Sequence, residues 1–148
     1  MLAQIVALFG AMILALSLAI QQPQEISFLN ELKGEVAARN FWAYQSATAS
    51  YIYSNPAATG TVADTNLTFP TGYIRNPAWT NIIQGGTLYT YSTATLPAHT
   101  ISRIAKLGGN SLMIGLANNG TMTSLSGGAT GFLLPAAIPN GAVVTIGN

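Results

Sequence analysis

The sequence predicts an α+β protein in which an N-terminal transmembrane helix continues into a long amphipathic helix packed on a small, mainly antiparallel β-sheet. Three observations predict this fold: an uncharged apolar run at the N-terminus, a helical spacing of apolar residues after it, and short β-rich segments between glycine turns. The anchor is expected at residues 1–20, the long helix at 21–55 and the β-rich domain at 56–148. The long helix and the β-rich domain are expected to pack as one globular unit.

Residues 1–20 form an apolar run that we expect to cross a membrane. Gln4 and Ser17 are its only clearly polar residues. As a helix, residues 2–20 would be about 28 Å long, close to the thickness of a bilayer's hydrocarbon core. A cleaved secretory signal is the alternative, but such a signal carries Lys or Arg before its apolar run, and none is present here. We therefore favour a retained anchor.

The orientation of this anchor follows from two opposing observations. Lys33 and Arg39 follow the apolar run, so the positive-inside rule leans towards a cytoplasmic C-terminal side. Both charges are far from the run, however, and residues 56–148 are rich in Thr, Asn and Gly and free of Cys. This composition favours an extracytoplasmic C-terminal domain.

The long helix is predicted by apolar and aromatic residues that recur at three- and four-residue spacing over residues 25–54. Pro23 suits the first turn of a new helix, and Asn55-Pro56 ends it because a residue before proline avoids the α region. Gly34 interrupts the helical pattern and is interpreted as a flexible point.

The remaining chain predicts short strands, one short helix and turns. Asn118-Asn119-Gly120 is typical of a hairpin turn, because Asn and Gly accept positive φ. A short helix is expected at residues 97–107. Residues 57–80 are expected to be mostly loop, with a turn that delivers Trp79 into a core. Strands are expected at residues 87–91, 112–116, 121–125, 132–134 and 142–146, with an edge strand at 67–69.

Composition excludes several functions. The chain of 148 residues has 5 Lys and Arg, 4 Asp and Glu and a formal net charge of +1, so no basic patch is large enough to bind nucleic acid. It has no Cys, which excludes disulfides, a thiol nucleophile and a Cys-based zinc site. One His and four acids leave little for acid–base catalysis or metal binding. We therefore expect no catalytic, cofactor-binding or metal-binding residues.

A hydrolase remains the alternative from another class. It would have to use His99, the only histidine, and Asp64, the only carboxylate beyond the long helix. Catalytic triads assemble from distant positions, but no nucleophile motif accompanies these two residues. A surface histidine at a helix end is the favoured interpretation of His99.

Aromatic residues of the long helix allow two interpretations. Phe41, Tyr44 and Tyr51 are expected to pack on the sheet, whereas Trp42 and Tyr53 point in other directions on a regular helix. Either loops clasp the helix on both sides, which we favour, or some aromatic side chains bind a partner, as Trp and Tyr often do. The candidate partner-binding residues are Trp42, Tyr53, Tyr73 and Trp79.

The general plan of a membrane helix, a long amphipathic helix and a small polar sheet resembles type IV pilins and pseudopilins. Those proteins carry a Glu at the fifth mature position, inside the apolar helix, whereas the first carboxylate here is Glu25. This departure argues against peptidase processing and against a role as a major pilus subunit. A pilin-like or minor pilin subunit of the fibre remains the alternative.

Several segments distributed over most of the chain carry a second resemblance. They are Phe41-Trp42-Ala43-Tyr44, Tyr51-Ile52-Tyr53-Ser54-Asn55-Pro56, Ala57-Ala58-Thr59-Gly60-Thr61-Val62-Ala63-Asp64, Leu67-Thr68-Phe69-Pro70-Thr71-Gly72, Pro77-Ala78-Trp79 and Leu134-Pro135-Ala136-Ala137-Ile138-Pro139-Asn140-Gly141. With the uncharged apolar N-terminus, they resemble the PilM family of type IVb (thin) pilus biogenesis proteins, found in conjugative plasmids and related bacteria. The resemblance implies a non-enzymatic, single-pass protein of the bacterial inner membrane with its C-terminal domain in the periplasm. It implies a place in the pilin transport apparatus or the pilus basal body, with the lipid bilayer and other pilus assembly proteins or pilin as partners, and possible homo-oligomers.

Overall fold

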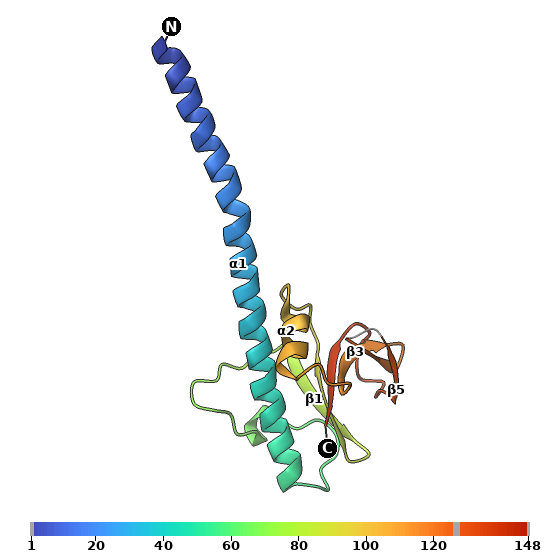
Figure 1. Cartoon of the computed structure of the whole chain (residues 1–148). Coiled ribbons are helices and arrows are strands. Elements are labelled where there is room, and N and C mark those ends of the chain that lie inside the picture. The colour runs from blue at the N-terminus through green and yellow to red at the C-terminus, as the bar shows by residue number, and fades with distance from the viewer. Residues whose placement is uncertain (1, 126–127, 148) are drawn as a thin grey trace.

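A computed structural model of the chain describes the backbone of residues 2–125 and 128–147, and the side chains of residues 25–125 and 128–147 (Figure 1). The described residues form a long helix, a short helix, one 3-10 turn and six strands. In chain order these are α1 (Leu2–Ser54), the 3-10 turn η1 (Asp64–Asn66), β1 (Trp79–Gln84), β2 (Thr87–Ser92), α2 (Thr100–Leu107), β3 (Ile114–Asn118), β4 (Thr121–Ser124), β5 (Ala129–Leu133) and β6 (Val143–Gly147).

Helix α1 is one continuous helix of 53 residues. The predicted continuation of the N-terminal segment into the long helix is observed. Pro23 lies inside this helix, so its interpretation as a residue of the first turn of a new helix is wrong: proline disfavours a helix interior but does not prohibit it. The N-terminal half of α1 projects away from the other elements, which lie along its C-terminal half (Figure 1). Among the residues with described side chains, no helix is both long and apolar enough to cross a membrane. The anchor predicted at residues 1–20 lies outside those residues.

The six strands form one antiparallel sheet in the order β1-β2-β6-β3-β4-β5. The last strand, β6, lies between β2 and β3, so the C-terminal segment ties the two halves of the sheet together. The Asn119-Gly120 turn between β3 and β4 has φ of 48° and 76°, as the predicted hairpin requires. The α+β class, the long helix and the antiparallel sheet are confirmed.

One predicted strand is absent, and one strand of the sheet was not predicted. Residues 67–69 form no strand; Leu67 is buried and Phe69 partly buried in the cluster around α1. Strand β1 was missed, because a buried polar residue, Asn81, interrupts its apolar alternation and Pro77 just before it indicates a turn. The predicted strands at 112–116 and 132–134 lie at Ile114–Asn118 and Ala129–Leu133, and the short helix begins at Thr100 rather than at residue 97.

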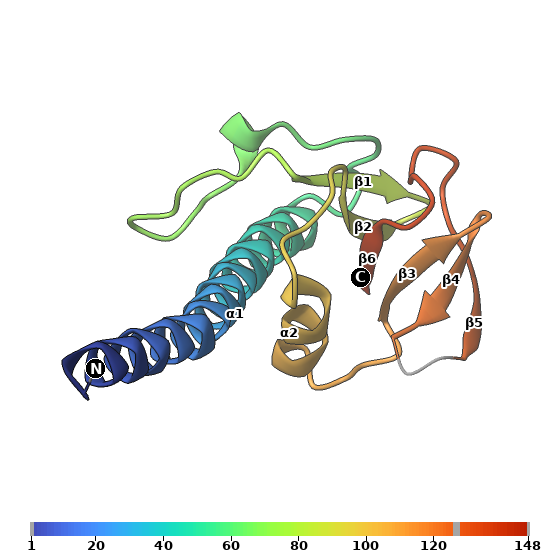
Figure 2. The same ribbon diagram turned by 90° about the horizontal axis from the view of Figure 1, so that it is seen from above.

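Helix α1 packs on the sheet from one side and is flanked by two further segments. Figure 2 shows α2 on one side of α1 and residues 62–78, which we call the strap, on the other. Phe41 and Tyr44, on the buried face of α1, are covered as predicted, whereas Tyr51 of the same helix is only half-buried. A smaller apolar cluster on other parts of the sheet includes Tyr91, Met122 and Val144.

Gly34 of α1 lies tightly against the backbone that leads into α2. A Cβ atom at this position would lie 2.6 Å from the carbonyl oxygen of Ala98 and 3.1 Å from the backbone nitrogen of Thr100. The residue is buried. Gly34 is therefore a packing requirement, and its interpretation as a flexible point is wrong.

Candidate protein-binding surface

Two of the four predicted partner-binding residues, Tyr73 of the strap and Trp79 of β1, form hydrogen bonds with Asn40 of α1. The indole Nε1 of Trp79 donates to Oδ1 of Asn40 at 2.9 Å, and the hydroxyl of Tyr73 donates to the same oxygen at 3.2 Å. Asn40 Nδ2 in turn donates to the carbonyl of Ile74 at 2.8 Å. Trp79 is fully buried with its ring edge-on to Phe41, so it presents no surface to a partner. Its selection as a partner-binding residue is corrected: it belongs to the core.

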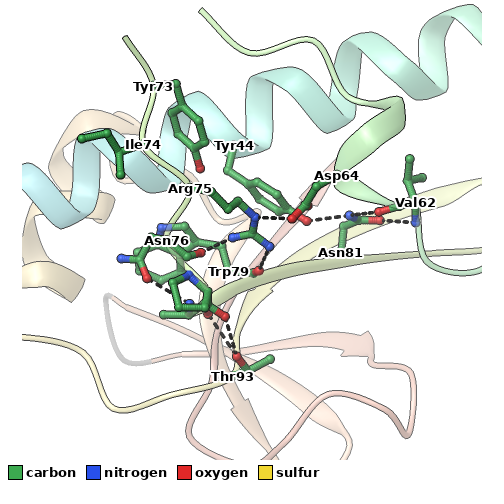
Figure 3. Close-up of polar contacts among 12 residues, drawn as sticks. Tyr44, Val62, Asp64, Tyr73, Ile74, Arg75, Asn76, Trp79, Asn81 and Thr93 are labelled. Atoms are coloured by element: carbon green, nitrogen blue, oxygen red, sulfur yellow. Dashed lines mark hydrogen bonds and ion pairs between the residues drawn. The ribbon is translucent and has the colours of Figure 1, made fainter.

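A second set of contacts fixes the strap through Arg75 (Figure 3). Its Nε lies 2.5 Å from Oδ2 of Asp64, its Nη1 and Nη2 donate to the backbone carbonyls of Asn76 and Trp79, and its guanidinium carbon lies 4.5 Å from the ring centre of Tyr44. The charge of Arg75 is thus compensated within the molecule. These contacts give Asp64 a structural partner.

Aromatic stacking and a buried amide complete this region. The ring of Tyr73 stacks on Phe69 at 4.4 Å. Asn81 donates to the hydroxyl of Tyr44 at 2.7 Å and to the carbonyl of Val62, whose N–H donates back to it. Burial raises the pKa of Tyr44 above 10, although the hydrogen bond from Asn81 opposes this, and burial likewise raises the pKa of Tyr73. These groups therefore stay neutral at physiological pH and hold the strap on α1.

The other two predicted residues lie apart from this region. Trp42 faces α2, where its Nε1 donates to the carbonyl of Ile104 at 3.2 Å and its ring lies against Gly108. Tyr53 is 90% exposed near the end of α1. Of the four, Tyr53 alone has a largely free side chain, so the structure does not gather them into one surface. A partner-binding role for Tyr53 stays a prediction.

The candidate catalytic pair is not assembled. His99 is exposed at the residue before α2, whereas Asp64 begins η1, and Figure 2 shows these elements on opposite sides of α1. Within the described residues, no group of three His, Cys, Asp or Glu side chains could hold a metal ion. The described geometry offers no arrangement of these residues for hydrolysis.

Charged side chains instead join α1 to α2. Arg103 of α2 lies 2.5 Å from Glu31 and 3.6 Å from Glu35, both on α1. Arg39 also pairs with Glu35, at 2.8 Å. These pairs are exposed or half-exposed, so each contributes less than about 1 kcal/mol to stability. The two contacts of Arg103 connect α2 to α1, whereas the Arg39–Glu35 pair lies within α1.

An apolar groove remains on the opposite flank of α1. One wall is formed by Leu29, Leu32 and Val36, whose side chains are exposed. Ile74, which is 81% exposed, and Pro77 form the other wall. The cavity between the walls measures about 610 Å³, and we call it the α1 groove. Large apolar side chains that are exposed next to one another form a patch of the kind that marks interaction sites.

The α1 groove is not predicted by the sequence. Its helical spacing was visible, since Leu29, Leu32 and Val36 are three and four residues apart. That spacing indicates an apolar face but not whether another part of the chain covers it. The missing information is where the strap leaves α1, which depends on contacts between residues 33 to 39 positions apart, such as Asn40 with Tyr73 and Trp79.

Comparisons with known proteins identify similar solved structures and a matching family model. The structure is similar to the crystal structure of a protein named PilM from Escherichia coli B7A, with a TM-score of 0.61 and 20% identity, over 86% of this chain and 94% of that one. A second similar crystal structure is that of a pilM protein from Pseudomonas aeruginosa 2192, with a TM-score of 0.49 and 32% identity, over 75% of this chain and 91% of that one. No curated protein matches the chain significantly. The family model of PilM matches residues 7–146. This chain therefore belongs to the PilM family.

Proposed function

We propose that this chain is a non-enzymatic inner-membrane component of type IVb (thin) pilus biogenesis that acts through protein–protein contacts. It would serve in the pilin transport apparatus or the pilus basal body. Membership of the PilM family supports a pilus-related function. The observation that carries the proposed mode of action is the α1 groove, an exposed apolar surface on a chain in which only 6% of the residues are charged.

The position of the groove along α1 supports a role next to a membrane. If residues 1–20 span the inner membrane, α1 continues from the bilayer into the periplasm without a linker. Val36 lies sixteen residues beyond Ile20, which corresponds to about 24 Å along a helix. The groove would then be held at a fixed height above the membrane surface, where it can contact other membrane-bound pilus proteins.

The absence of an enzymatic role is part of this proposal. Asp64 of η1 is engaged by Arg75, and α2, which directly follows His99, lies on the other side of α1 from η1 (Figure 2). The carboxylates of Glu31 and Glu35 pair with arginines. Asp64, Glu31 and Glu35 are thus engaged in ion pairs, and the elements that carry Asp64 and His99 are separated.

A pilin-like or minor pilin subunit is the second candidate. The protruding N-terminal half of α1 favours it, because a helix that extends from a small sheet domain is the plan of pilins (Figure 1). The lack of a carboxylate before Glu25 argues against it. The two candidates predict recovery in different fractions: a fibre subunit is recovered in sheared pili, whereas a component of the pilus base is recovered in the inner membrane.

Deletion of the gene in a pilus-producing host tests the proposal. We expect deletion to abolish surface pili, and the full-length chain to restore them, as counted by electron microscopy. The variant His99→Ala should restore pili as well as the unmodified chain does. Normal pili in the deletion strain would contradict a role in biogenesis, and failure of His99→Ala with an unchanged melting temperature would reopen the enzyme alternative.

A further inference from the structure

We propose that the α1 groove binds a helix of another pilus protein, a helix that rises from the same membrane and carries an apolar stripe with a carboxylate beside it. This inference rests on the proposed function, because it takes residues 1–20 as a membrane anchor. It adds the surface, the class of partner and the charge that the partner must supply.

The shape and chemistry of the groove fit a helix that runs alongside α1. Leu29, Leu32 and Val36 are spaced as i, i+3 and i+7, so they form one ridge about 10 Å long. They are 53%, 46% and 66% exposed. Helices pack by placing such a ridge into the groove of a neighbour at 8–10 Å between axes. Ile74 forms the opposite wall and would clasp the occupant from its other side.

The groove lies next to the part of α1 that the strap already covers. Further along α1, the strap covers Asn40 and Tyr44 through Tyr73 and Arg75. The groove is lined by Asn40 and Arg75 at its end next to the strap and by Leu29 and Leu32 along α1. An occupant would therefore extend the covered face of α1 towards the membrane.

The charge of the lining specifies an acidic partner. Lys33 lines the groove and has no ion pair among the described residues, and no acidic side chain lines the groove with it. The other lining cation, Arg75, is paired with Asp64. A carboxylate on the occupant would meet Lys33 at the rim of an apolar contact, where ion pairs select partners and orientation.

A second copy of this chain and a lipid fit less well. Two copies that met through this face would place Lys33 near Lys33 and would bring no carboxylate from the groove lining. A bilayer's polar headgroup layer extends about 5–8 Å beyond its hydrocarbon core on each side. Val36 would lie about 24 Å beyond Ile20 along the helix, above the reach of a lipid that stays in the bilayer.

Site-specific cross-linking in cells tests the proposal, and the absence of native cysteine makes single-cysteine variants unambiguous. The full-length variant Val36→Cys is labelled with a photoreactive maleimide in a host that assembles pili. Ser46→Cys, an exposed position of α1 outside the groove, is the matched control. We expect a covalent adduct with a membrane-anchored pilus protein. Mass spectrometry should map it to a helix that follows the partner's membrane span, beside an Asp or Glu.

Reversing the charge of Lys33 provides a second test, of whether the partner supplies a carboxylate. Lys33→Glu, introduced with Val36→Cys, should lower the yield of this adduct about tenfold, whereas Lys33→Arg should retain it. Replacing the partner's carboxylate by Lys should restore the yield with Lys33→Glu. Circular dichroism of the purified chains would verify that both variants fold.

Four results would overturn the inference: an adduct between two copies of this chain, an adduct with phospholipid, a yield no higher than that of Ser46→Cys, or equal yields from Lys33→Glu and Lys33→Arg. Each leaves the proposed function standing if deletion of the gene still abolishes pili. If deletion leaves pili intact, the proposed function itself fails, whatever the cross-linking shows.

Discussion

Gly34→Ala should destabilise the protein, although the same change stabilises most helices. Helix propensity alone favours alanine over glycine by about 0.8–1 kcal/mol. At Gly34, however, the added Cβ would lie 2.6 Å from the carbonyl oxygen of Ala98, which belongs to the backbone and cannot rotate away. The sign of the effect therefore distinguishes tight packing between α1 and α2 from an ordinary solvent-facing helix position.

The magnitude follows from this geometry. Ordinary contact begins at 3.4 Å, so the backbone before α2 must retreat by about 0.8 Å, the difference between 3.4 and 2.6 Å. Overpacking of this kind costs about 1–3 kcal/mol. Because the clash is with backbone atoms rather than with the end of a flexible side chain, the upper part of this range applies, about 2–3 kcal/mol. Subtracting the propensity gain of about 0.8–1 kcal/mol leaves a net loss of about 1–2 kcal/mol. For a chain of 148 residues this lowers the melting temperature by about 2–8 °C.

The assay is thermal and urea unfolding of the full-length chain in detergent micelles, followed by tryptophan fluorescence. Trp42 reports on the contact with α2 and Trp79 on the core. Gly128→Ala is the matched control, because a Cβ at Gly128 meets no atom within 4 Å. It should change the free energy of unfolding by less than about 0.5 kcal/mol. A Gly34→Ala variant as stable as the unmodified chain, or more so, would refute the close approach of the two segments.

Further variants test the buried amide, the ion pair, the buried phenol and the lone histidine. Asn81→Ala should lower the free energy of unfolding by about 2–4 kcal/mol in urea titrations, because its buried partners lose their hydrogen bonds. Asp64→Asn should cost less than about 1 kcal/mol in the same titrations, because its pair with Arg75 is 44% and 31% exposed. Burial raises the pKa of Tyr91 above 10, so the folded state prefers the neutral phenol; its stabilising contribution is complete below pH 10 and is lost as pH rises through the raised pKa. Tyr91→Phe should therefore flatten the fall in urea midpoint between pH 9 and pH 11. His99→Ala should leave the melting temperature within about 2 °C of the unmodified chain, because His99 is exposed.

Local signals in the sequence were sufficient for much of the fold. The spacing of apolar residues over 25–54 predicts the helix because it repeats over many turns. The Asn119-Gly120 hairpin depends on two adjacent residues that accept positive φ, so no distant contact is needed to predict it. Strand β6 was predicted from its own β-rich sequence, although its central position in the sheet follows only from pairing with β2 and β3.

The features that sequence could not supply depend on distant partners. Asn81 is buried because the hydroxyl of Tyr44 and the backbone of Val62 satisfy it, and neither partner is adjacent in sequence. A tryptophan that binds a partner and one that packs inside the chain look the same in sequence. The indole N–H groups of Trp42 and Trp79 both donate to acceptors within this chain. An apolar stripe on a helix looks the same whether it is covered or open.

The most direct test of the central claim, a membrane-anchored assembly component, is to fractionate cells that assemble pili and to sequence the N-terminus of the recovered protein. We predict recovery in the inner membrane, with Met1 or Leu2 as the first residue and none of the protein in sheared pili. Recovery in sheared pili with a shortened N-terminus would contradict the account and would favour a subunit of the fibre.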